Sequence, residues 1–266
     1  MGALKQVWQK GRGVRPGRIA RDARLSFRLR LRGADAEDRE RLSRVFVGAE
    51  LSREQQALAV AHIAPNGGGT EVVVRSPRVG GEEVAVDWVA PEAGLAALLQ
   101  RYGRYRLALA RVFPALRPVL ARQLIIAVAS RNAAVAAVSA LPEVIPTPLS
   151  LVLALGEMGS DTVLITVNQM ALCFELAAMR GQAVGWRAQA APLAGIVAAA
   201  LGWRTLAREL VGLIPAGIGV SAKAAIAFGG TMAVGKALWR GPGIHTQGDV
   251  EIGPTRGRVE RWEESA

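Results

Sequence analysis

The sequence predicts an α+β protein, in which a small α/β unit precedes an all-α, hydrophobic helical domain. Residues 25–32 (LSFRLRLR) alternate between apolar and polar side chains, as a half-buried strand does. After Pro91 no strand pattern appears, and long Ala-, Leu- and Val-rich runs follow as far as Trp239. We therefore divide the chain into a basic leader (1–24), the α/β unit (25–92), the helical domain (93–240) and a polar tail (241–266).

The leader carries most of the excess charge. The formal net charge is +11, and residues 1–33 hold ten Lys or Arg against Asp22 as the single acid. We expect its arginines to contact the anionic face of a membrane; they are Arg12, Arg15, Arg18, Arg21 and Arg24. With aromatic residues at 5%, stacking on single-stranded nucleic acid is not favoured. The alternative is a solvated basic face, and a short amphipathic helix is predicted at Ala3–Lys10.

The α/β unit opens with the alternating strand, and Gly33 turns the chain. A helix is predicted over Ala36–Phe46, because Asp35 is a suitable N-cap and acids occupy the first turn. The later predicted elements are a helix at 52–63 and two short apolar strands at 71–75 and 84–89.

The helical domain is predicted as a series of helices separated by proline and glycine. Pro114, Pro118 and Pro142 are expected to interrupt the chain, as is Gly202. The predicted helices are residues 93–112, 120–141, 149–157, 161–180, 187–203, 204–214 and 217–240.

Some of these runs approach the length of about 20 apolar residues that a membrane-spanning helix needs. Thr162–Met179 comes close but contains Asn168, Gln169 and Glu175, and the run 210–235 contains Lys223. A charge at the bilayer centre costs about 2.5–3.5 kcal/mol. We therefore expect these four polar side chains to face one another inside a bundle, with hairpins centred on 161–203 and 206–239.

Three tryptophans stand at the ends of apolar runs, each followed by an arginine. They are Trp186, Trp203 and Trp239, with Arg187, Arg204 and Arg240. Tryptophan and arginine are typical of membrane–water interfaces, so these pairs are predicted interfacial anchors. The alternative is a soluble helical bundle with small residues at its helix crossings.

No constellation for catalysis is found in the sequence. Cys173 is the single cysteine and lies in an apolar run, where a buried hydrophobic role is usual. His62 and His245 are far apart and lack metal-ligand neighbours. We therefore expect a non-enzyme, with no catalytic residue, metal site or cofactor.

Three runs of the helical domain carry a resemblance to a known family. They are PALRPVLARQLIIAVASRNAAVAAVSALPEVIP, DTVLITVNQMALCFELAAMRG and LARELVGLIPAGIGVSAKAAIAFGGTMAVGKAL. Their shared features are Asn132-Ala133, Leu141-Pro142 with Ile145-Pro146, Asn168-Gln169 and Ile214-Pro215. In this order they resemble the YcjF-type GTPase-associated bacterial domain of unknown function, over roughly residues 108–240. That domain usually follows an Era-like GTPase domain.

The resemblance implies that the α/β unit is a relic of such a GTPase domain; an unrelated α/β unit with the same opening is the alternative. The strand 25–32 runs into Gly33, as in a phosphate-binding loop with the signature G-x-x-x-x-G-K-[ST]. Here Asp38, Arg39 and Glu40 stand where Gly, Lys and Ser/Thr are required. Carboxylates there repel phosphate, so the loop is predicted to be degenerate and unable to bind a nucleotide.

The expected function is that of a non-enzymatic, membrane-associated accessory or scaffold protein. The expected partners are membrane lipid, a separate GTPase and a second copy of the chain; nucleic acid is not expected. Because the opening MGALKQVWQKGRG lacks an apolar signal region, the expected location is the cytoplasmic side of the bacterial inner membrane. The alternatives are a soluble cytosolic helical interaction module, located in the cytoplasm, and a divergent nucleotide-binding protein.

Overall fold

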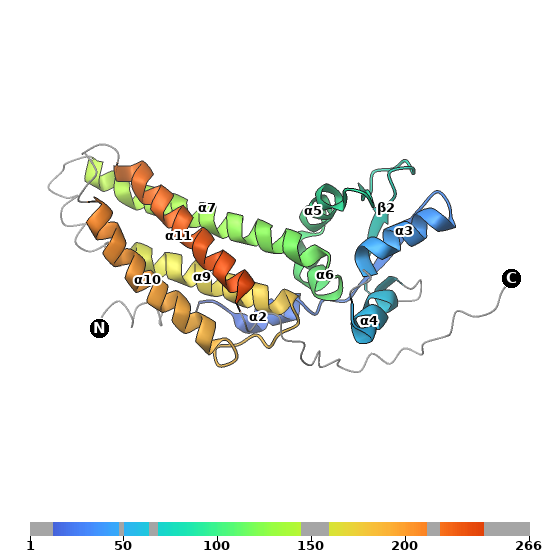
Figure 1. Ribbon diagram of the computed structural model, residues 1–266, viewed down its shortest axis with the longest axis horizontal. Helices are drawn as coiled ribbons and strands as arrows, with labels where there is room; N and C mark the ends of the chain where they lie inside the picture. Colours follow the sequence, from blue (N-terminus) through green and yellow to red (C-terminus); the bar gives the residue numbers. More distant parts are fainter. Residues whose placement is uncertain (1–12, 48–50, 64–68, 145–159, 212–218, 242–266) are drawn as a thin grey trace.

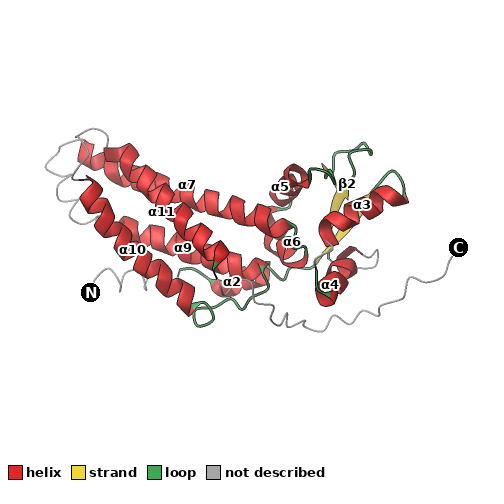
Figure 2. Ribbon diagram, in the orientation of Figure 1, coloured by secondary structure: helices red, strands yellow, loops and turns green. Residues whose placement is uncertain are grey.

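The computed structural model describes residues 13–47, 51–63, 69–144, 160–211 and 219–241. It is an elongated α+β structure, as the sequence predicts. The strands lie at one end, among short helices, and long helices run side by side away from them (Figures 1 and 2). The helices predicted at 3–10 and 149–157, Arg12, and the tail beyond residue 241 lie outside the described residues.

The sheet has three parallel strands in the order β1-β2-β3, namely β1 (Phe27–Arg32), β2 (Thr70–Arg75) and β3 (Val84–Ala85). The alternation in β1 sets its two faces. Phe27 and Leu29 are buried, while Arg28 and Arg30 lie on the other face within 3.6 Å and 3.5 Å of the Glu71 carboxylate. The strands predicted at 25–32 and 71–75 are thereby confirmed.

The strand predicted over 84–89 is wrong in its length. Val86 N still donates to Arg75 O at 3.0 Å, but the ladder then ends. The Asp87 carboxylate accepts a hydrogen bond from Val89 N at 2.9 Å, which turns the chain as Asp side chains commonly do. Pro91 then begins the next helix, α5.

Helices α3 (Ala36–Val47) and α4 (Arg53–Ile63) connect β1 to β2 and pack against β1. Asp35 caps α3 as predicted, because its carboxylate accepts from Asp38 N at 2.8 Å. The rings of Phe27 and Phe46 lie 6.0 Å and 5.4 Å from that of Phe113, which follows α6 (Arg106–Val112). Aromatic packing therefore joins the sheet to the start of the helical part.

The helix predicted over 93–112 is divided in the structure into α5 (Pro91–Arg101), a 3-10 turn η1 (Gly103–Tyr105) and α6. The break brings two tyrosines to β2. The Tyr102 hydroxyl accepts from Val73 N at 3.2 Å, and the Tyr105 hydroxyl lies 2.5 Å from Thr70 Oγ1. These hydrogen bonds stabilise the bend at the expense of a continuous helix.

The bundle consists of α7 (Leu116–Val144), α9 (Ser160–Met179), α10 (Ala190–Val211) and α11 (Gly219–Arg240). Three predicted interruptions are wrong, and one of them, Pro142, lies in the last turn of α7. Pro118 lies in the first turn of α7, where its missing N–H has no intrahelical partner to lose. Gly202 lies within α10, because an isolated glycine weakens a helix by only about 1 kcal/mol.

Gly235 allows α11 to approach α7 closely. A Cβ at this position would lie 2.7 Å from the Ile125 side chain, so a larger residue would push the two helices apart. Close contact between these two helices brings polar groups of both into the same buried layer, as described below.

The larger of two hydrophobic clusters among the described residues joins the sheet to the bundle, and the smaller one lies between α9 and α10. The larger cluster extends from the sheet residues through α6, in which Leu107–Ala110 are all buried, to Leu120 of α7 and Leu176 of α9. The α/β part and the bundle therefore share a core, although their compositions differ.

Candidate functional site

Two described helices are long and apolar enough to cross a membrane, by length and composition alone. They are Leu116–Ser139 of α7 and Thr162–Met179 of α9. The core helix of a soluble protein satisfies the same test, so these helices favour membrane association only weakly. The hairpin expected at 161–203 covers α9 and α10, which contact each other, and the one expected at 206–239 covers the end of α10 and α11, which also contact each other. In addition, α11 packs along α7.

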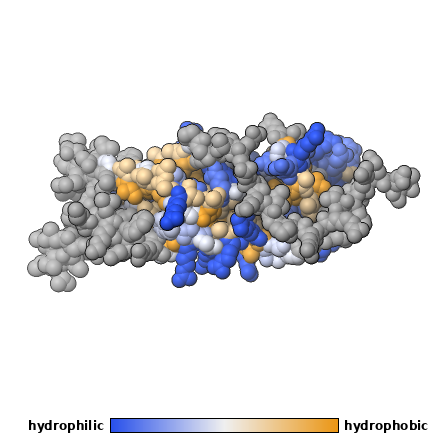
Figure 3. All heavy atoms as spheres, turned by 90° about the horizontal axis from the view of Figure 1, so that it is seen from below, coloured by the Kyte–Doolittle hydropathy of each residue, from blue (hydrophilic) through white to orange (hydrophobic). Residues whose placement is uncertain are grey.

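The outward-facing side chains of the bundle favour membrane association more strongly than helix length does. We call them the apolar surface. Its exposed residues are Ile126, Ala127, Ser130, Arg131, Ala134 and Val138 of α7, Leu164 of α9, Ala194, Gly195, Ala198 and Gly202 of α10, and Ser221, Ala225, Phe228, Gly229 and Ala233 of α11. Val138 is 66% exposed, and Arg131 is the single charge in this set. Figure 3 shows hydrophobic colours on part of the bundle, hydrophilic colours near its base, and both kinds at the α/β end.

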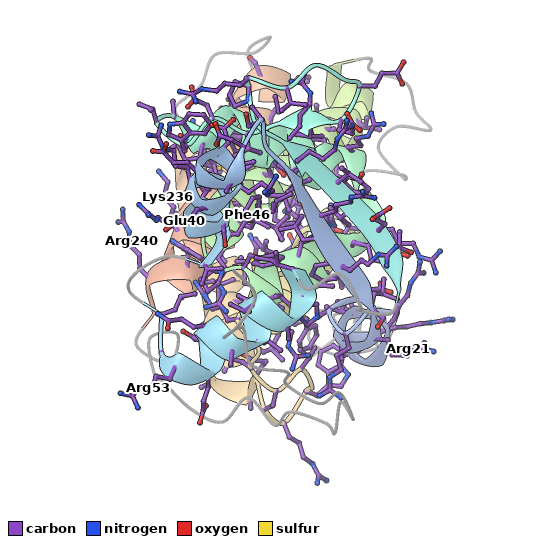
Figure 4. The ribbon with its side chains drawn as sticks, turned by 90° about the vertical axis from the view of Figure 1, so that its right-hand side faces the viewer. Arg21, Glu40, Phe46, Arg53, Lys236 and Arg240 are labelled. Atoms are coloured by element: carbon purple, nitrogen blue, oxygen red, sulfur yellow. The ribbon has the colours of Figure 1, made fainter. Side chains whose placement is uncertain are left out.

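Positively charged side chains gather at the base of the bundle, the end that adjoins the α/β part. We call this set the basic rim; its exposed residues are Arg15, Arg18, Arg21, Arg24, Arg122, Arg187, Lys236 and Arg240. Figure 4 shows Lys236 and Arg240 on one side of the molecule and Arg21 on the opposite side. The rim therefore reaches around the base of the bundle.

The predicted leader is not a free arm from Pro16 onward. Helix α2 (Pro16–Asp22) begins at Pro16, because proline is well suited to a first helical position. Val14 and Ile19 pack against a buried cluster that includes Phe174, as Trp186 does. The four described leader arginines therefore form part of the rim, in fixed positions.

Polar side chains of three helices meet inside the bundle. Asn132 of α7 donates from Nδ2 to Thr231 Oγ1 of α11 at 2.9 Å, and its Oδ1 accepts from Asn168 Nδ2 at 2.7 Å. Gln169 Nε2 donates to Thr231 Oγ1 at 3.3 Å. Asn132 and Thr231 are fully buried and Gln169 is 4% exposed. The structure thus brings two of the four predicted polar residues together with two others.

Glu175 and Lys223 lie elsewhere. The Glu175 carboxylate accepts from the Arg106 guanidinium at 3.0 Å, at the junction with α6. Lys223 is half-buried, eight residues before Thr231 on α11, which places it about 12 Å along the helix axis. The expected single cluster of Asn168, Gln169, Glu175 and Lys223 does not form. Thr231 has no signal in the sequence except as a hydroxyl within a glycine-rich helix.

Two of the predicted tryptophan anchors lie at the base of the bundle; the side chain of Trp203 is outside the described set. The Trp186 ring contacts Phe174 edge-on at 5.1 Å. The Arg180 guanidinium lies 4.0 Å from the centre of the Trp239 ring and donates to Trp239 O at 2.9 Å, so it also caps α11. Both rings are half-buried beside the basic rim.

The loop after β1 is closed by the protein's own carboxylate. Asp38, 1% exposed, accepts from Ala34 N at 3.2 Å and from Ser76 Oγ at 2.9 Å, and pairs with Arg78 at 3.3 Å. Burial opposes its ionisation, but the Ser76 and Ala34 hydrogen bonds and the charges of Arg78 and Arg41 outweigh this and lower the pKa of Asp38. An anion therefore lies at the start of α3, where the resemblance to a GTPase domain would place a phosphate.

His62 packs against the hydrophobic core of the α/β part. Its Nδ1 lies 2.9 Å from Leu58 O, and its ring lies 5.0 Å from that of Phe27. In the part of the chain that the structure describes, no three His, Cys, Asp or Glu side chains come together as metal ligands would.

Comparisons with known proteins give no family assignment: a scan of protein-family models and searches of curated proteins and solved structures find no match. The resemblance to the YcjF-type domain stays a prediction.

Proposed function

We propose that the protein is a non-enzymatic, membrane-associated accessory or scaffold protein. In this proposal lipid surrounds the outer part of the helical bundle, and the α/β part stays in water. The observation that carries it is the apolar surface, in which Arg131 is the single charge among the side chains that the structure describes.

A water-soluble helix normally carries charged and polar residues on its outward face. Here Ile126, Val138 and Leu164 are 40%, 66% and 39% exposed, and their exposed neighbours are mostly alanine and glycine. The polar groups Asn132 and Thr231 are buried and bonded to each other instead. A hydrocarbon environment favours this arrangement, in which the outward side chains are apolar and the polar side chains are hydrogen-bonded inside the bundle.

The apolar surface is short for a full crossing. On α11 its residues from Ala225 to Ala233 lie between Lys223 and Lys236, a stretch of twelve residues or about 18 Å, against about 30 Å for the hydrocarbon core. The proposal therefore includes re-entrant hairpins as well as hairpins that span the membrane.

A soluble cytosolic interaction module is the second candidate. It is favoured by the continuous core, which joins the bundle to the sheet through α6, and by the burial of most of α9. A helix buried among protein neighbours needs no lipid.

The closed loop at Asp38 supports a role without a nucleotide. A divergent nucleotide-binding protein is therefore the least favoured of the three. If the α/β part derives from a GTPase domain, a separate GTPase is the natural candidate partner, and a second copy of the chain is another.

Carbonate extraction of membranes containing the full chain separates the first two candidates. We expect the protein to stay in the membrane pellet at alkaline pH, where proteins held only by charge are released. Recovery of a monodisperse protein in the supernatant without detergent would replace the membrane proposal with the soluble module.

A further inference from the structure

Consecutive helices of the bundle run in opposite directions. Asn132 of α7 contacts Thr231 of α11, and a Cβ on Gly235 would meet Ile125, so α7 and α11 are antiparallel. As a result, the last residues of α7 and α10 and the first residues of α9 and α11 lie at the same end, away from the α/β part (Figure 1). Both links that join these pairs leave from that outer end.

Helices α7 and α9 form the first hairpin, and α10 and α11 form the second. The two ends of the first hairpin differ strongly in positive charge. Six arginines lie between Arg101 and Arg122, at the base of the bundle, whereas no Lys or Arg occurs from Asn132 to Met179. The second hairpin differs less. Its base has Arg180, Arg187, Lys236 and Arg240, and its outer end has Arg204, Arg208 and Lys223. Helix α2 and the residues next to it add four exposed arginines to the base, namely Arg15, Arg18, Arg21 and Arg24.

Positively charged residues close to the ends of membrane helices stay on the cytoplasmic side, and the first helix usually dominates. Resting on the proposed function, we infer that both hairpins enter the membrane from the cytoplasmic side. The basic rim then lies at the cytoplasmic headgroups, and the α/β part lies in the cytoplasm. The half-buried rings of Trp186 and Trp239 lie at the same level, where aromatic residues are enriched.

Site-directed labelling tests this orientation, because Cys173 is the single cysteine and is buried. In a Cys173→Ala background, Ala57→Cys places a thiol on an exposed position of α4, and Ser150→Cys places one in the link between α7 and α9. Intact spheroplasts of a bacterial host are treated with a membrane-impermeant maleimide, before and after lysis. The same membranes are also washed with carbonate, to measure whether the full-length protein stays in the pellet.

We expect Ala57→Cys to be labelled only after lysis. Ser150→Cys is then labelled from outside if the hairpins span, or from neither side if they are re-entrant, and both results support the orientation. Labelling of Ala57→Cys in intact spheroplasts, with the protein retained after carbonate, overturns the orientation alone. So does labelling of Ser150→Cys only after lysis. Release by carbonate overturns the proposed function and the orientation with it.

Discussion

Asn132 and Thr231 are 99 residues apart in the chain, yet Asn132 Nδ2 donates a hydrogen bond of 2.9 Å to Thr231 Oγ1 in the centre of the bundle. Both side chains are fully buried. The Thr231 hydroxyl also accepts from Gln169, so one oxygen joins three helices.

Replacing Thr231 with valine should therefore destabilise the bundle. Valine keeps the shape of threonine but removes the acceptor, which leaves two buried amide donors without that partner, at about 1–3 kcal/mol each. Unfolding of the detergent-solubilised protein should show the loss as a lower melting temperature. Thr231→Ser keeps the hydroxyl and is the control. Equal melting temperatures for the two variants would mean that the hydrogen bonds contribute little.

The apolar surface predicts a contrast between two exposed valines. Val138 of the bundle is 66% exposed and Val89 of the α/β part is 82% exposed. In water, lysine at either position should change stability by less than about 0.5 kcal/mol. In lipid, Val138→Lys alone should cost up to about 2.5–3.5 kcal/mol and lower the fraction retained in membranes. Quantitative fractionation of both variants measures this. Identical retention would remove Val138 from the lipid contact.

The basic rim predicts binding to anionic vesicles that depends on salt. Arg15 and Arg21 are exposed beside or within α2, and each basic residue near such a surface contributes about 1 kcal/mol. Arg15→Ala/Arg21→Ala should therefore weaken co-sedimentation with vesicles containing phosphatidylserine at low salt. Added salt should reduce the difference, because charges are screened beyond about 10 Å at 0.1 M. Arg39→Ala/Arg53→Ala removes the same charge from the α/β part and should bind like the unchanged protein.

Asp38 predicts an acid-dependent contribution to stability. Because the folded state lowers its pKa below the usual 3.8, the carboxylate stabilises the fold above that value, and the contribution is lost as the pH falls through the lowered pKa. Asp38→Asn should be less stable than the unchanged protein at pH 7, and the gap should narrow toward pH 3. Denaturant unfolding at both pH values tests this. A gap that is constant with pH would show that ionisation of Asp38 has no part in it.

The same carboxylate predicts that GTP does not bind. A phosphate at the start of α3 would meet the Asp38 anion, which already holds Ala34 N and Ser76 Oγ. Titration calorimetry with Mg²⁺ and GTP should show no heat of binding at millimolar nucleotide. Micromolar affinity would contradict the closed loop.

The sequence was sufficient where a local pattern decides the structure. The alternation in residues 25–32 specified β1 and its two faces, and Asp35 was a recognisable N-cap. Proline was misleading at Pro118, because it lies in the first turn of α7, where a helix tolerates proline. In the bundle, Asn168 and Gln169 were recognisable as inward-facing, but their partners Asn132 and Thr231 come from other helices. Single-chain periodicity holds no information on such pairings.

The shared core has a consequence for any attempt to divide this protein. A cut near residue 92, where the composition changes, would leave Phe27 and Phe46 without the ring of Phe113, and would separate α4 from α6. Neither fragment would keep a complete hydrophobic core, so we expect the two parts to unfold in a single transition. Moving the bundle from one environment to another, such as from detergent to lipid, should then alter amide hydrogen exchange in β1, although β1 lies at the other end of the molecule.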